Sequence, residues 1–247
     1  MAIRSVMSGR WTAALGLAAA FALGVAAQRG GLVDQVAKYR GDIAFLSQQH
    51  MKLVAISGGL AILIGVPLGL WLSRPRMRGA AETIMQALNL GSTIPTLAVL
   101  ALSMSLLGIG VVPAIFGLWA ASLLPIVRNT YAGMLGVPPH FIEAATGMGM
   151  RPLQILSGVE VPNALFVMFA GIRTALAINV GTAPLAFLIG GGGLGELIFT
   201  GIDLQDYPMM LAGAIPTALL AVAVDFLFGQ AQYWLVPRGV NPLRSVA

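Results

Sequence analysis

Charged residues are almost absent from four long stretches of this sequence. Between them these stretches hold a single charged side chain, Asp225, which lies near the end of the last one. A helix crosses the hydrocarbon of a membrane with about 20 mostly apolar residues. Only 9% of the chain is charged, whereas soluble domains average about 25%. The pattern predicts an all-α integral membrane protein with spans in 53–73, 83–127, 174–195 and 208–228.

The number of spans depends on two segments. Residues 83–127 are too long for one helix and about right for two, and the glycines and proline within 106–113 predict the turn between them. Residues 12–27 are apolar and follow Arg4 and Arg10. This is the pattern of a cleaved signal peptide or of a short uncleaved span. We favour the uncleaved span, which gives about six helices, whereas cleavage leaves about five.

The basic residues predict the orientation of the chain. Lys and Arg collect in the cytoplasmic loops of membrane proteins, and most arginines of this chain fall on one side if there are six helices. The first loop is the exception, with Arg29, Lys38, Arg40 and Lys52. The distribution predicts a multi-pass protein of the plasma (inner) membrane with both termini in the cytoplasm. Because the basic residues fill the gaps between apolar runs, the net charge of +5 does not indicate a nucleic-acid partner.

The longest predicted cytoplasmic connection, 129–162, holds the polar segment EAATGMGMRPLQILSGVEVP at 143–162. Long loops with structure of their own tend to be functional. Residues 141–150 are expected to form a short helix that Gly149 and Pro152 end.

Two alanines of this short helix, Ala144 and Ala145, give it a face with little side-chain bulk. Another surface can approach such a face closely, which favours docking in a groove of a second protein. The alternative is a helix that rests on lipid headgroups. Residues 141–150 contain no basic side chain to attract anionic lipid, so docking on a protein is the preferred interpretation.

The segment resembles the EAA loop of ABC-importer permeases, whose pattern is Glu-Ala-Ala, three residues, Gly, nine residues and Ile-x-Leu-Pro. The matching positions here are Glu143, Ala144, Ala145, Gly149, Val159 and Pro162. Valine replaces the usual Ile and Leu. In that family the loop is the coupling helix, which seats in a cleft of the cytoplasmic ATPase. The resemblance therefore implies a polar contact between Glu143 and an ATPase, beside a charge effect at the helix N-terminus.

Other stretches resemble permease subunits of osmoprotectant importers, among them ISGGLAILIGVPLGLWLSR, LLPIVRNTYAGMLGVP and FAGIRTALAINVGTAPLAFLIGGGGLGELIFTGI. This resemblance covers residues 50–245 and implies a type I ABC-importer-like transmembrane domain at 46–235. Residues 1–45 are then expected to form a cytoplasmic tail, an extra helix and an external loop, and residues 236–247 a second cytoplasmic tail.

The resemblance also implies an assembly and a cargo. Two permease subunits, identical or paralogous, would pair with two ATPases and one external binding protein, which we expect to be a separate polypeptide. ATP then binds the partner ATPase, and this chain binds no cofactor. The implied cargo is a quaternary amine such as glycine betaine, choline or carnitine. The alternatives are another small polar solute such as an amino acid or, less favoured because no internal repeat is visible, a secondary transporter.

Two charged residues and a glycine run are candidates for a pore or gate. Charges inside a span are costly and usually functional, yet near the cytoplasmic end Arg173 can snorkel or form a helix-packing hydrogen bond. Asp225 can likewise reach cytoplasmic water. Gly191, Gly192 and Gly193 belong to a formal G-x-G-x-x-G pattern that lacks the βαβ unit of a nucleotide site. We expect them to permit close packing or a tight re-entry beside the pore.

An enzyme is the main rival class of function. The only histidines, His50 and His140, lie in loops or at the edges of spans, and the chain has no cysteine. We therefore expect neither catalytic residues nor a metal site. The chain is also only 7% aromatic, so the aromatic cage that suits quaternary ammonium is expected on the binding protein.

Overall fold

The computed structural model describes residues 31–242 and 244. The apolar segment 12–27, predicted as an additional span, lies outside the described residues. Every regular element in the described part of the chain is helical, which confirms the all-α prediction.

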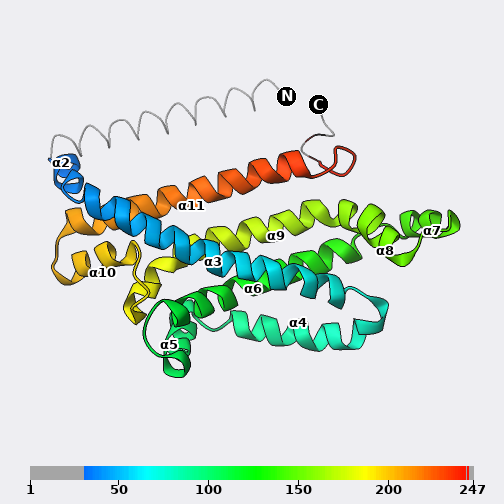
Figure 1. Ribbon diagram of the computed structural model, residues 1–247, viewed down its shortest axis with the longest axis horizontal. Helices are drawn as coiled ribbons and strands as arrows, with labels where there is room; N and C mark the ends of the chain where they lie inside the picture. Colours follow the sequence, from blue (N-terminus) through cyan, green and yellow to red (C-terminus); the bar gives the residue numbers. More distant parts are fainter. Residues whose placement is uncertain (1–30, 243, 245–247) are drawn as a thin grey trace, which may run out of the picture.

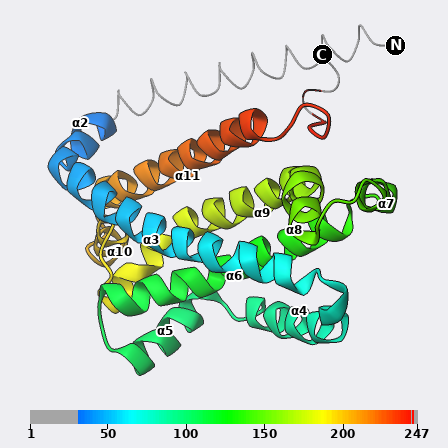
Figure 2. The same ribbon diagram turned by 45° about the vertical axis from the view of Figure 1, so that its right-hand side comes forward.

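Four long helices form the body of the molecule: α3 (Arg40–Leu72), α6 (Val111–Leu135), α9 (Val161–Thr182) and α11 (Tyr207–Leu235). They run side by side along the long axis, with α3 and α9 packed on α6 and with α11 packed on α9 (Figure 1, Figure 2). Each is long and apolar enough to cross a membrane, α9 together with the helical turns that flank it.

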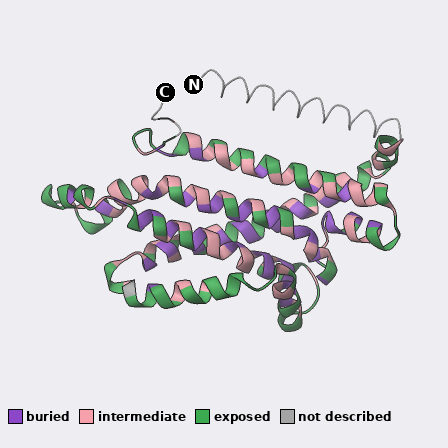
Figure 3. Cartoon of the chain, turned by 180° about the vertical axis from the view of Figure 1, so that it is seen from behind, coloured by how far each residue is buried: buried purple, intermediate pink, exposed green. Residues whose placement is uncertain are grey.

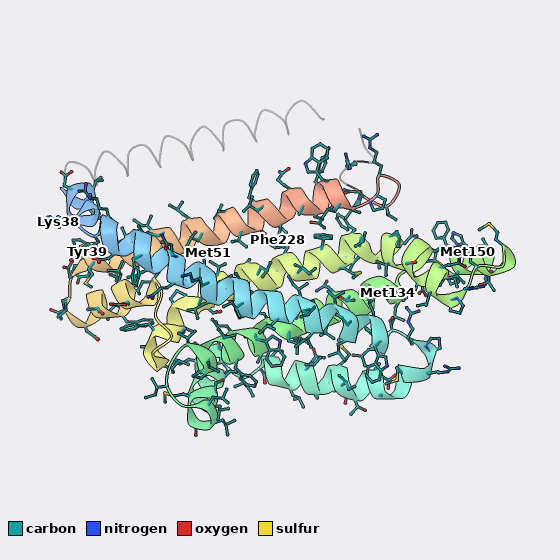
Figure 4. All side chains as sticks on the ribbon, viewed as in Figure 1. Lys38, Tyr39, Met51, Met134, Met150 and Phe228 are labelled. Atoms are coloured by element: carbon teal, nitrogen blue, oxygen red, sulfur yellow. The ribbon has the colours of Figure 1, made fainter. Side chains whose placement is uncertain are left out.

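Short elements occupy the two ends of this body. At one end, called the α10 end below, lie α2 (Leu32–Ala37), η3 (Ala183–Ile189) and α10 (Gly195–Asp203). At the other, called the α7 end, lie α7 (Pro139–Gly147), α8 (Pro152–Ile155) and the π-helical η2 (Leu156–Glu160). Lys38 and Tyr39 are seen at the α10 end and Met150 at the α7 end (Figure 4).

The stretch 83–127 differs from the two helices expected. After the short η1 (Pro75–Met77), the chain forms α4 (Arg78–Ser92) and α5 (Thr96–Leu107), which meet at an angle of 98°. The break is at Pro95, whose backbone is extended (ψ 137°). Proline also disfavours a helical conformation at the residue before it. The first of the two expected helices is therefore two shorter helices, α4 and α5, that meet at a bend.

The turn expected within 106–113 is confirmed. Gly108 and Gly110 have φ of 83° and 131°, a region of backbone conformation that favours glycine, and α6 starts directly after them. If the bent pair is counted as one span, the described residues hold up to 5 spans. This is the number expected without the N-terminal segment.

All four long helices extend beyond the predicted spans, and two of them begin well before the predicted start. α3 begins at Arg40 rather than at Leu53, and α9 begins at Val161 rather than at Thr174. The predictions ended each span at a charged residue, but the hydrogen bonds of a helix continue past a charge that has water or a partner. Arg173 consequently lies about three turns into α9, deeper than the place near the cytoplasmic end expected from the sequence.

The core lies where α3, α6 and α9 face one another, and buried residues concentrate there whereas α4 is largely exposed (Figure 3). Close approach of α6 and α9 depends on Gly171, since a Cβ there would lie 2.7 Å from the Pro125 carbonyl oxygen. At the centre Asn179 donates through Nδ2 to Ser57 Oγ and Ser122 Oγ, both at 2.9 Å. These bonds, each worth about 0.6 kcal/mol in a membrane protein, fix α3, α6 and α9 in register.

Candidate functional site

α7 projects from the end of the helical body (Figure 1, Figure 2). It begins at Pro139, a residue suited to the first helical turn because it has no N–H to leave unpaired. It ends in a Schellman motif, in which Gly149 has φ 76°, Gly149 N donates to Thr146 O at 2.9 Å and Met150 N donates to Ala145 O at 3.1 Å. The prediction that Gly149 ends this helix is confirmed.

The two alanines of α7 differ in exposure. Glu143 and Ala144 are exposed, whereas Ala145 is 1% exposed. The expectation that both alanines form one open face is wrong, because successive residues of a helix point about 100° apart and Ala145 faces the chain that returns through α8 and η2. The open surface of α7 includes Glu143 and Ala144, with the exposed apolar side chains of Phe141 and Met148 beside them.

The return segment is helical rather than a loop. The expected connection 129–162 starts inside α6, which continues to Leu135, and residues 152–162 belong to α8, η2 and the first turn of α9. Val159 lies in the π-helical η2, where Val161 N donates to Leu156 O, five residues back. Pro162 accounts for this wide turn, because a proline ring collides with the carbonyl four residues earlier in a regular α-helix.

An ion pair ties the return segment to α3. Arg74 Nη1 lies 2.8 Å from Glu160 Oε2, and Arg74 also donates to the Leu70 carbonyl and to Ser73 Oγ. Glu160 is the last residue of η2, directly before α9. A π-helical turn often marks a functional site. Through this ion pair and the chain itself, η2 is connected both to the end of α3 and to the start of α9.

Arg173 and Asp225 form a two-bond ion pair between α9 and α11. The distances are 2.5 Å from Nε to Oδ1 and 2.6 Å from Nη2 to Oδ2. Asp225 lies well inside α11, which continues to Leu235, so it is deeper than its expected place near the end of the last span. Gly229 leaves room for the guanidinium, since a Cβ there would lie 3.2 Å from Arg173 Cζ. The pair borders a cleft of about 470 Å³.

The glycine run packs against α3 and α6 at the α10 end. A Cβ at Gly191 would lie 2.7 Å from Ala114 Cβ, and one at Gly192 would lie 2.6 Å from Gln49 Oε1. Gly192 and Gly193 also have φ of 75° and 85°. The residues form an irregular turn directly after η3, which is the last part of the span Pro152–Ile189. This arrangement agrees with the close packing expected from the sequence.

A family model described as "Binding-protein-dependent transport system inner membrane component" matches residues 65–239, more than half of the chain. The chain belongs to this family. The resemblance inferred from the Glu-Ala-Ala segment is thereby confirmed, and the permease is a multi-pass membrane protein.

Two curated relatives are similar to this permease over most of its length. The osmoprotectant import permease protein OsmY of Salmonella typhimurium is 57% identical to this permease over 186 residues, which are 75% of this chain and 79% of OsmY. The choline transport system permease protein OpuBB of Bacillus subtilis is 40% identical over 207 residues, 84% of this chain and 94% of OpuBB. Both names describe permease proteins, one for osmoprotectant import and one for choline transport.

The solved structures confirm the fold. The permease is similar to a chain of the MetNI methionine ABC transporter in inward-facing conformations, with TM-scores of 0.71 and 0.68 in two crystal forms. These matches cover 79% and 77% of this chain and 96% and 94% of the MetNI chain, at 23% and 24% identity. The expected ABC-importer transmembrane fold is therefore present.

Sequence reasoning did not find the partners of two charges in this permease. The sequence placed Arg74 at the edge of a span and Glu160 within the motif. No local pattern indicates that two residues so far apart in the sequence form an ion pair. Arg173 and Asp225 were considered separately, although each is the partner of the other. The available signal was the scarcity of charge, because a charge within an apolar helix needs a partner of opposite sign.

Proposed function

We propose that this permease forms part of the membrane pathway of an ATP-driven importer for quaternary amines of the glycine betaine, choline and carnitine type. ATP is hydrolysed on a separate ATPase. A second permease subunit, identical or paralogous, completes the pathway, and an external binding protein delivers the solute. The observation that carries the proposal is the projecting α7, with its exposed Glu143 and Ala144, in a permease related to osmoprotectant permeases.

The charges of the two ends support an orientation with the α7 end in the cytoplasm. Basic residues at or near the α7 end are Arg74, Arg76, Arg128, Arg151, Arg238 and Arg244, beside the acidic Glu143 and Glu160. Acidic residues at the α10 end are Asp34, Asp42, Glu196, Asp203 and Asp206, and they outnumber the basic Lys38, Arg40 and Lys52 there. Positive charge on the cytoplasmic side is the rule for membrane proteins. In this orientation α7 meets the ATPase, and the C-terminal residues lie in the cytoplasm.

The mechanism follows from the rigidity of α7 and its attachments. The Schellman motif at Gly149 fixes the end of α7, and the Arg74–Glu160 ion pair fixes η2. When ATP closes the ATPase pair, the seated α7 moves with it and shifts α9 relative to α11. ATP thereby biases one of two pathway states, as any ligand does that binds the two states differently.

Reconstitution in proteoliposomes tests the proposal. The permease, its ATPase and its binding protein are combined, and ATP hydrolysis is measured with the binding protein empty or loaded with glycine betaine, choline, carnitine or methionine. We expect a quaternary amine to stimulate hydrolysis several-fold and to be taken up only with ATP. Uptake driven by an ion gradient without ATP would support a secondary transporter instead. Stimulation by methionine alone would support an amino-acid importer.

A further inference from the structure

A cleft of about 260 Å³ opens at the α10 end, far from α7. One wall is a face of α3, and the others are the start of α6 and the glycine run. Its lining includes Gln49, Lys52, Leu53, Ile56, Val111 and Gly192. The residues of α3 recur at the helical spacing of three and four, so they present a continuous surface to the cleft.

Lys52 marks the boundary of the hydrocarbon at this end. α3 has 33 residues and is therefore about 50 Å long, whereas the hydrocarbon is only about 30 Å thick. The charge-free segment between Lys52 and Arg74 alone spans about 30 Å. The Lys52 ammonium therefore lies at the membrane–water interface, where a solute arriving from the α10 side leaves water.

In the cleft, the polar side-chain groups that have no partner are all hydrogen-bond donors. Gly193 N donates to Gln49 Oε1 at 3.2 Å, which fixes the amide so that its NH₂ is left over. Lys52 is exposed, and among the described residues it has no ion-pair partner. The backbone N–H of Gly192 also lacks a hydrogen-bond acceptor within the described part of the chain. No acidic side chain lines the cleft.

The cleft is held in shape by its glycines. Gly192 has φ 75° and leaves no room for a Cβ beside Gln49, as described above. Gly191 is packed against Ala114 of α6. The donors are consequently placed before a ligand arrives, which reduces the entropy that binding would otherwise cost.

We propose that this cleft binds the carboxylate of a zwitterionic solute, such as glycine betaine or carnitine, as the solute enters the pathway. Lys52 supplies the charge, Gln49 Nε2 and Gly192 N supply hydrogen bonds, and Leu53, Ile56 and Val111 border the methylated ammonium. The inference rests on the proposed function and deepens it. Choline has a hydroxyl group instead of the carboxylate, so it gains little from Lys52. A lipid phosphate carries the same oxyanion chemistry and is the competing source of ligand.

Lys52→Met tests the inference in the complete transporter. Initial uptake of glycine betaine and of choline is measured with saturating loaded binding protein, and each rate is divided by that of the unsubstituted transporter. The preferences of the binding protein cancel in this ratio. We expect glycine betaine uptake to fall about two- to fivefold, the effect of losing one exposed charged contact, with choline uptake unchanged. Lys52→Arg keeps the charge and should retain most glycine betaine uptake.

The control is Lys38→Met, an exposed lysine at the same end that does not line the cleft, and it should leave both rates unchanged. Equal loss of both solutes in Lys52→Met, or no loss of either, would overturn the carboxylate site. An effect on both solutes that appears only in anionic liposomes would assign Lys52 to a lipid headgroup and also overturn it. Failure of the unsubstituted transporter to carry either solute contradicts the proposed function itself.

Discussion

Replacing Ala144 by tryptophan is expected to abolish solute uptake while the permease remains in the membrane at its normal level. Ala144 is exposed on α7, so the larger side chain meets no other part of this chain. It would instead hold an ATPase surface away from the helix. Overpacking of a fitted surface costs about 1–3 kcal/mol, which corresponds to a loss of about 5- to 150-fold in ATPase binding. Uptake, ATP hydrolysis and co-purification of the ATPase should fall together.

Two tryptophan substitutions at other alanines serve as controls. Ala218→Trp places the same side chain at an exposed position of α11, and it should leave ATPase binding unchanged. Ala145→Trp introduces the side chain at a buried position, and it should lower the amount of folded permease. Normal uptake and normal ATPase co-purification in Ala144→Trp would contradict docking at α7.

Removing one member of the Arg173–Asp225 pair is expected to have the second-largest effect. Asp225→Leu leaves a guanidinium without its carboxylate between α9 and α11, and an unpaired charge within a span is costly. Both side chains are more than a third exposed, at 38% and 41%, so we expect a loss of about 1–3 kcal/mol rather than the larger penalty of a fully buried charge. The measurement is thermal inactivation of the purified permease together with its uptake rate.

A double variant distinguishes the loss of the ion pair from the effect of leaving one charge unpaired. Arg173→Met with Asp225→Leu leaves no unpaired charge, and replacing an ion pair by apolar residues of similar size is often neutral even where the pair is fully buried. We expect it to recover the stability and most of the uptake lost in Asp225→Leu. A double variant less stable than Asp225→Leu, or an Asp225→Leu variant of normal stability, would contradict the role of the pair in holding α9 against α11.

The sequence was most informative where one local rule decides a structure. The apolar runs identified the helices of the body because length and lack of charge are what a span requires. Gly149 predicted the end of α7 because only a residue that tolerates positive φ completes a Schellman motif without strain. The Glu143–Pro162 motif led directly to the family.

Features that depend on tertiary contacts were less accessible. The burial of Ala145 follows from the path of the chain through α8 and η2, which the motif does not specify. The bend between α4 and α5 was signalled by Pro95, but prolines also occur within α3, α6 and α11, where the helices continue. The pairing of Arg173 with Asp225 required the packing of α9 on α11 to be known.

The side of the membrane on which α7 lies is the most direct test of ATP coupling through this permease. Because the chain has no cysteine, Glu143→Cys provides a single reactive thiol on an exposed site. A membrane-impermeant maleimide should label it in inside-out vesicles but not in intact cells, and added ATPase should protect it. Asp203→Cys, an exposed position at the α10 end, should show the opposite sidedness. Labelling of Glu143→Cys from outside intact cells would contradict coupling at α7.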